Sequence, residues 1–304
     1  MTLHVGAQLP VNSIPGHGGD VDLAAVARHA EAVGLDSVWT GDRLSAPFPV
    51  LDSSLVLATA AAATERIALG YGVMLLALRS AAWAARQIGT LQRLSHGRVL
   101  LGVGVGSGDE AEWAAAGVPP RQRGERTDRL LTLLPGLLAG EPTELTDMPG
   151  RPRVALRPPA PAPAVWIGGT SDTALRRAVV HGKGWLSTMK TPEQFARATA
   201  GLADLAAERQ VPVPDAGTNV FVRMTERPGA GASTAAADRL SALYGLDREA
   251  AAAVTVGGSP RQVAERLSEY VEAGAGHLVL VPLDDDTFQQ YELFAETRAL
   301  LLKG

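Results

Sequence analysis

The stretch Pro163-Ala-Val-Trp-Ile-Gly-Gly-Thr-Ser-Asp172 joins the two kinds of structure that alternate along the chain. An apolar run predicts a buried strand, two glycines and two hydroxyl residues follow, and a segment of helical composition comes next. Glycine lets the backbone turn tightly near a ligand, and the free N–H groups at a helix start favour an anion. The turn is therefore either a phosphate cradle or a simple helix cap. Its residues are Gly168, Gly169, Thr170 and Ser171.

The same strand-then-helix unit recurs almost from end to end. Short apolar runs predict strands over residues 3–9, 37–40, 66–73, 98–105, 165–168, 185–187, 219–224 and 277–281. Helical patterns separate them, at 21–33, 53–63, 81–94, 126–138, 173–181, 192–208, 260–273 and 287–302. This alternation predicts an α/β fold, and at this length a closed (β/α)8 TIM barrel with a doubly wound sheet as the alternative. We expect one domain over residues 1–304, with insertions at 140–162 and 226–258, the second partly helical over 235–244.

Composition excludes several classes of function. The 304 residues carry a net charge of −4, which argues against nucleic-acid binding because that needs a basic face. The chain has no cysteine, which excludes disulfides and thiolate catalysis and fits a cytoplasmic protein. Neither a signal peptide nor a long uncharged apolar run is apparent, so we expect no membrane partner. No two histidines have metal-ligand spacing, and we expect a small-molecule substrate without a metal.

Seven motifs occur in an order that carries a family resemblance. They are Ala30–Asp42, Ala63–Val73, Leu94–Gly106, Arg123–Asp128, Trp166–Ser171, Gly182–Trp185 and Gly258–Leu267. The ordered set resembles the bacterial luciferase-like flavin-dependent oxidoreductases. That resemblance implies a (β/α)8 barrel with a large insertion, and a flavin or deazaflavin at the C-terminal ends of the strands. The sequence is most similar to the branch that uses coenzyme F420, a deazaflavin, and next to the FMN-dependent monooxygenases.

The resemblance also implies positions for the cofactor. Asp42 matches the acidic end of the second strand, where many relatives continue with histidine and this chain has the fixed cation Arg43. Gly72 and Val73 match a site where relatives often carry a non-proline cis peptide behind the ring system. The other implied contacts are Gly104, Val105, Gly106 and Ser107 near the ring edge, and Gly168, Gly169, Thr170 and Ser171 at the phosphate.

Position along the predicted strands sorts further polar residues, because active sites of such barrels lie at the C-terminal strand ends. Of six histidines, only His17 can reach this face, from the loop after the first strand. His17 is either a catalytic residue or substrate contact, or an exposed loop side chain. Arg223 and Lys190 follow later strands, and together with Arg43 they are candidates to hold an anionic cofactor tail.

The carboxylates near the strand ends allow two interpretations. Asp42 is either a catalytic or cofactor-binding residue, or it pairs with Arg43 or Arg79. For Glu110 and Glu112, after the fourth strand, we expect a solvated helix start rather than a place in the pocket.

Hydride transfer needs no side-chain nucleophile, because the cofactor carries the chemistry and the protein supplies position and electrostatics. We therefore expect an oxidoreductase that passes hydride between F420 and a small organic substrate. The alternatives are an FMN-dependent monooxygenase and a barrel that binds cofactor without turnover. Family members often dimerise, so a homodimer is expected. The loops that would select the substrate carry no recognisable code.

Overall fold

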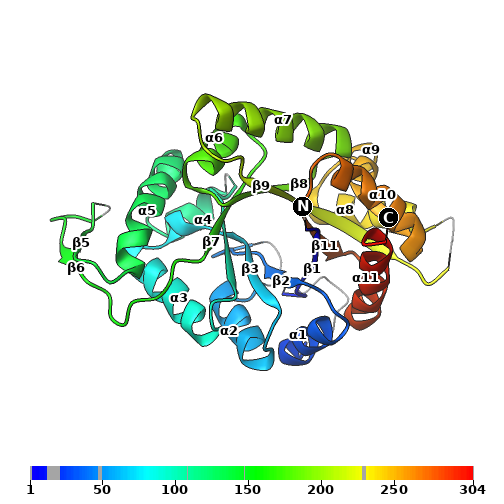
Figure 1. Ribbon diagram of the computed structural model, residues 1–304, viewed down its shortest axis with the longest axis horizontal. Helices are drawn as coiled ribbons and strands as arrows, with labels where there is room; N and C mark the ends of the chain where they lie inside the picture. Colours follow the sequence, from blue (N-terminus) through cyan, green and yellow to red (C-terminus); the bar gives the residue numbers. More distant parts are fainter. Residues whose placement is uncertain are drawn as a thin grey trace.

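The predicted TIM barrel is confirmed in the computed structural model, which describes residues 2–11, 21–46, 50–107, 109–146, 148–227 and 231–303. Parallel strands form a closed ring with helices outside it (Figure 1). The barrel strands are β1 (His4–Gln8), β2 (Ser37–Thr40), β3 (Ala68–Met74), β4 (Val99–Val103), β7 (Ala164–Gly168), β8 (Gly184–Thr188), β9 (Asp215–Met224) and β11 (His277–Pro282). Pairing of β8 with β9 closes the ring.

The helices follow the predicted alternation closely. They are α1 (Leu23–Ala32), α2 (Ser53–Ala63), α3 (Ala81–Leu94), α4 (Glu110–Ala115), α5 (Arg123–Leu138), α6 (Asp172–His181), α7 (Pro192–Glu208), α8 (Ala232–Tyr244), α9 (Arg248–Ala253), α10 (Pro260–Glu272) and α11 (Thr287–Leu301), with short 3-10 turns at Leu76–Leu78 and Pro120–Gln122. None of the helices in these ranges is long and apolar enough to cross a membrane.

The two insertions contain strands that the sequence did not predict. In the first, β5 (Thr143–Glu144) and β6 (Arg153–Val154) form a short antiparallel hairpin that projects from the barrel (Figure 1). In the second, β10 (Thr255–Gly258) adds to β9 in parallel beside α8 and α9. Strands this short carry too little periodicity to be recognised from sequence.

The barrel interior is filled by large side chains that face glycines on neighbouring strands. Trp39 and Trp166 are buried there, together with Leu186 and Val279. A Cβ at Gly70 would lie 2.1 Å from the Trp39 ring. Trp39 is therefore a packing residue, and side chains fill the interior of the barrel.

Candidate active site

The turn after β7 is held in one conformation by its neighbours. Gly169 has φ of 133°, a backbone conformation open essentially to glycine alone. A Cβ added at this position would lie 2.9 Å from the Cβ of Ala174. The indole Nε1 of Trp185 donates to the Gly169 carbonyl at 2.8 Å, and the Gly169 amide donates to Leu186 O at 3.3 Å. Trp185 is fully buried, so it fixes the turn from below.

The helix after the turn begins at the expected cap. Ser171 is the N-cap of α6, and its hydroxyl accepts from the Ala174 amide at 3.3 Å. The cap interpretation is therefore correct, and it leaves the cradle open, because one cap satisfies only one of the unpaired amides at a helix start. The exposed hydroxyl of Thr170 makes no hydrogen bond to another described residue.

Beside this turn lies a groove of about 500 Å³ that is lined by backbone and by arginines. Its lining residues are Val105, Pro120, Arg121, Arg123, Gly124, Gly168, Gly169, Thr170, Ser171, Thr173, Ala174 and Arg177. Arg177 is nearly buried and pairs with Asp128. Within the described residues Arg121 and Arg123 form no ion pair, so two positive charges in the groove are not neutralised.

The ends of β3 and β4 meet through one side chain. The peptide bond between Gly72 and Val73 is cis, where the resemblance implies such a bond. Cβ atoms built at Gly104 and Gly168 would lie 2.4 and 2.6 Å from the Val73 methyl groups. Both glycines are therefore required for packing, and only their backbone atoms are left to contact a ligand. Val73 itself is half-buried above the packed interior.

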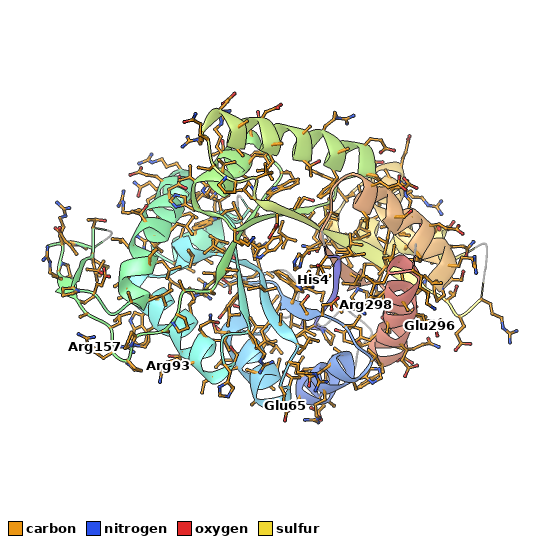
Figure 2. The ribbon with its side chains drawn as sticks, in the orientation of Figure 1. His4, Glu65, Arg93, Arg157, Glu296 and Arg298 are labelled. Carbon is orange, nitrogen blue, oxygen red and sulfur yellow. The ribbon has the colours of Figure 1, made fainter. Side chains whose placement is uncertain are left out.

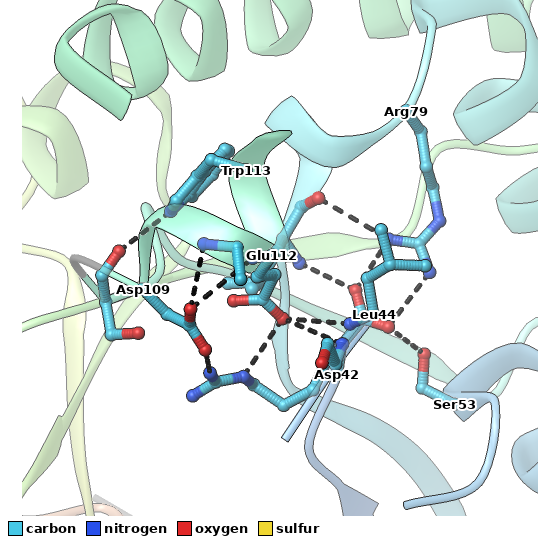
Figure 3. A network of polar contacts seen from close by, with 12 residues as sticks. Asp42, Leu44, Ser53, Arg79, Asp109, Glu112 and Trp113 are labelled. Carbon is cyan, nitrogen blue, oxygen red and sulfur yellow. Dashed lines mark hydrogen bonds and ion pairs between the residues drawn. The ribbon is translucent and has the colours of Figure 1, made fainter. Parts of the chain in front are cut away.

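Asp42, at the end of β2, is held in a buried ion pair (Figure 3). Its oxygens accept from Arg79 Nη1 and Nη2 at 2.6 and 2.9 Å, from Ser53 Oγ at 2.8 Å and from the Leu75 amide at 2.9 Å. The Asp42 side chain is 1% exposed. The structure therefore shows the ion pair with Arg79 that the sequence offered as one alternative. A catalytic or cofactor-binding role for Asp42 stays a prediction.

Tyr71, which lies near the Asp42–Arg79 ion pair, is buried as well. Burial raises the pKa of Tyr71 to about 12, while its hydrogen bond to Ser54 acts in the opposite direction. Tyr71 is fully buried, so this phenol stays neutral at physiological pH.

Arg43 pairs across the barrel mouth with the helix that follows β4. Its Nε donates to Glu112 Oε1 at 3.0 Å, and its Nη2 lies 3.4 Å from an Asp109 carboxylate oxygen (Figure 3). Glu112 is fully buried and also accepts from the Leu44 amide at 2.9 Å. The expectation of a solvated helix start is therefore wrong for Glu112, while Glu110 is exposed as expected.

The rest of the strand-four segment leaves the barrel core. Val105 and Gly106 are half-exposed, and Ser107 is exposed, with its carbonyl accepting from Trp113 Nε1 at 2.8 Å. Gly106 has φ of 69°, and a Cβ there would lie 2.9 Å from the Trp113 ring. Of these residues only Val105 lines the groove at the turn. Cofactor contacts at all of them stay predictions.

Each of the remaining predicted site residues has a different setting. Arg223, at the end of β9, pairs with Asp284 at 2.9 Å, so its charge is balanced. Lys190, after β8, lines a second groove and forms no side-chain bond or ion pair among the described residues. His17 lies outside the described residues.

Two of the histidines that were not expected to reach the C-terminal strand ends lie at the opposite end of the barrel. His4 and His277 start β1 and β11 and stack with ring centroids 4.6 Å apart, and His4 lies inside the ring of strands (Figure 2). Burial, and then the neighbouring His4, lowers the pKa of His277 to about 4. The described residues contain no cluster of three or more acidic or histidine side chains suited to a metal.

Sequence reasoning missed two contributors to the site. Arg121 was not singled out, because a lone arginine before a helix has no recognisable pattern. The hydrogen bond from Trp185 to Gly169 joins β8 to the turn after β7, a contact that no local pattern encodes.

Comparison with family models identifies the group of proteins. The model described as luciferase-like monooxygenase matches residues 9–230. The chain belongs to this family. The resemblance found in the sequence is thereby confirmed, and so is the class, since the similar proteins are oxidoreductases and monooxygenases.

Individual relatives use both kinds of cofactor. An F420-dependent glucose-6-phosphate dehydrogenase of Beutenbergia cavernae is 28% identical over 316 residues, 90% of this chain and 91% of that protein. A solved F420-dependent secondary alcohol dehydrogenase with an F420-acetone adduct superposes with a TM-score of 0.84 at 16% identity, covering 99% of both chains. The oxygenating constituent of 3,6-diketocamphane monooxygenase from Pseudomonas putida, in complex with FMN, has a TM-score of 0.74 at 19% identity, covering 97% of both. A flavin or deazaflavin therefore fits the family.

Proposed function

We propose that this protein is an oxidoreductase that binds coenzyme F420 and passes hydride between the deazaflavin and a small organic substrate. The observation that carries the proposal is the groove beside the Gly168–Ser171 turn, at the C-terminal end of β7. Backbone amides, hydroxyls and two arginines that form no ion pair with a described residue line this groove. Such donors around a helix start are suited to a phosphate. Full-length similarity to an F420-dependent dehydrogenase supports the choice of cofactor.

The charge in the groove favours F420 over FMN. A single phosphate is satisfied by the amides and hydroxyls of the turn, as in many nucleotide sites. Arg121 and Arg123 add two positive charges beyond that requirement. The F420 side chain carries carboxylates after its phosphate, whereas FMN ends at the phosphate. The two arginines are therefore better explained by the longer anionic side chain.

The residues of this chain would contribute by holding the cofactor in position. When bound, the deazaflavin would supply the carbon that accepts or releases hydride. Val73 would support the ring from the barrel side, and the backbone of Gly104 would allow close approach. The ion pairs Asp42–Arg79 and Arg43–Glu112 hold the loops after β2, β3 and β4 in place, so the ring site is preformed.

The test is a fluorescence and absorbance titration with four ligands: F420, its phosphate-free deazaflavin precursor, FMN and riboflavin. We expect saturable F420 binding, at least about tenfold weaker binding of the precursor because the phosphate contacts are lost, and little binding of FMN. Tight FMN binding without F420 binding would overturn the proposal in favour of an FMN-dependent monooxygenase. F420 binding without oxidation or reduction of any alcohol or ketone in a broad panel would favour a non-catalytic barrel.

A further inference from the structure

The side chain of Gln8 lies at the C-terminal strand ends and has no hydrogen-bond partner among the described residues. Its Nε2 is 3.9 Å from a Cβ built at Gly41, and apart from the chain neighbours of Gly41 no other described heavy atom lies within 4 Å of that position. Its Oε1 is 3.8 Å from a Cβ built at Gly72, the glycine of the cis peptide bond. Gln8 is partly exposed, so its carboxamide faces open space beside these two glycines.

The backbone around Gln8 is fixed on both sides. The Gln8 carbonyl accepts from the Oη of Tyr291 at 2.7 Å, and the next amide, of Leu9, donates to Trp39 O at 2.8 Å. A Cβ built at Gly6 would lie 3.0 Å from Trp39 Nε1, so Gly6 is on the inner face of β1. Strand alternation puts Gln8, two residues later, on the same face. The strand therefore holds the carboxamide toward the interior of the barrel.

A second amide on the inner face also lacks a partner. A Cβ built at Gly217 on β9 would lie 3.3 Å from the Trp166 ring, so alternation places Asn219 on the inner face, one step nearer the strand end. The Oδ1 of Asn219 is buried and accepts no hydrogen bond within the part of the chain that the structure describes. A buried acceptor without a donor is costly, so a ligand that supplies a donor would be stabilised here.

The two amides belong to one sector of the ring of strands. Only β11 lies between β9 and β1 (Figure 1). Val279 on β11 is in register with both Asn219 and Gly6. Gln8 follows Gly6 by two residues, so it lies one inward-facing position nearer the strand ends than Asn219. The interior of this sector thus carries two amides in successive layers.

The charged side chains at this end of the barrel are engaged elsewhere. The carboxylate of Asp42 and the guanidinium of Arg43 are held in ion pairs, and Arg223 pairs with Asp284. The histidines that the structure describes lie at strand starts, in helices or in helix-to-strand turns, and none of them directly follows a strand. The free polar groups that β1 and β9 present to the interior are therefore neutral amides.

We propose that Gln8, with Asn219 as a second contact, binds the hydroxyl or carbonyl oxygen of an uncharged substrate. A carboxamide both donates and accepts hydrogen bonds, so it can hold either the alcohol or the carbonyl form. The same site disfavours a carboxylate or phosphate, because a charge buried without a counter-charge is costly. This inference rests on the proposed function for the reaction, and it adds the class of substrate and the residues that select it.

The first experiment follows the side-chain amide signals of Gln8 and Asn219 by nitrogen–proton NMR. Each signal is assigned by its loss in Gln8→Met or Asn219→Leu, and the signal of Gln289, an exposed residue of α11, is the internal control. The probes are acetone, 2-propanol, cyclohexanone and cyclohexanol, with acetate and inorganic phosphate as charged counterparts.

We expect saturable shifts of the Gln8 and Asn219 signals with the uncharged probes, no shift with the anions, and a constant Gln289 signal. Unshifted signals with all uncharged probes, or shifts with the anions alone, would overturn the inference. A shift at Gln8 alone would overturn the second contact at Asn219.

A kinetic arm uses F420 and the alcohol or ketone probe that is turned over. Gln8→Met removes the donor and the acceptor at similar size, so kcat/KM should fall about tenfold through the lost hydrogen bond, while F420 affinity and the urea midpoint stay constant. Gln289→Met removes a carboxamide that donates to Glu226 Oε1 at 3.1 Å on the outside of the barrel, and it should match the wild type.

The outcomes of the kinetic arm separate the inference from the proposed function. Equal kcat/KM for Gln8→Met and wild type would overturn the inference, and so would a loss of F420 affinity that accounts for the fall in kcat/KM. A wild type that binds no F420 would refute the proposed function, and the NMR titration would still decide whether the amides bind an uncharged oxygen.

Discussion

At the ends of β2 and β4, Asp42 is paired with Arg79 and Arg43 with Glu112. Around the end of β7 and after β8, no ion pair is formed within the described residues by Arg121, Arg123, Lys190 or Arg197. Both regions lie at the same end of the barrel, and both carry charged residues on the segments that follow the strands. The first uses charge to fix its loops, and the second leaves charge available. A charged residue at a strand end therefore indicates a binding role only when the fold leaves it unpaired.

The largest expected effect on stability comes from breaking the ion pair between Asp42 and Arg79. Asp42→Asn leaves Arg79, which is 18% exposed, without its counter-charge, and should lower the free energy of unfolding by about 3 kcal/mol. Urea denaturation measures this change. The matched control is Asp284→Asn, which breaks a half-exposed pair with Arg223 and should cost less than about 1 kcal/mol.

The same variant decides between the two interpretations of Asp42. Unchanged stability together with lost turnover would show that Asp42 acts in catalysis and not through the ion pair. A large loss of stability, with cofactor affinity retained below the unfolding temperature, would show that Asp42 acts through the ion pair with Arg79.

A smaller effect in free energy is expected at the Gly168–Ser171 turn, where the measured quantity is cofactor affinity. Gly169→Asp places a side chain at φ of 133° and a carboxylate beside the phosphate position, so cofactor affinity should fall by about 100-fold or more while the barrel stays folded. Titration and circular dichroism measure the two properties. Gly117→Asp is the control, since Gly117 also has positive φ and has open space around its Cβ position. Retained affinity in Gly169→Asp would refute the cradle.

The strand and helix pattern was predictable because it depends on local periodicity. The helices Ser53–Ala63, Ala81–Leu94 and Pro192–Glu208 begin and end where the sequence places them. The Gly168–Ser171 turn was also predicted from local composition. Lys190 and Arg197, which line a groove together with Thr170 of this turn, belong to the next strand–helix unit.

The partners of the charged side chains were much harder to predict, because these ion pairs join residues that are far apart in the chain. Glu112 is buried only because Arg43 and the following loop, about seventy residues earlier, supply donors to its carboxylate. The sequence offered two arginines for Asp42 and had no means to choose between them. The strand β10 was missed because its four residues lie between two helices in an insertion.

The stacked imidazoles of His4 and His277 make the barrel sensitive to acid. The pKa of His277 is about 4 in the folded protein and about 6.5 in the unfolded chain, so between these values the unfolded state binds more protons. Stability from this group is therefore present above pH 6.5 and is lost as the pH falls toward 4. Denaturation midpoints of wild type and His277→Gln should converge across this range. Acid therefore weakens the fold through the end of the barrel that lies opposite the proposed cofactor site.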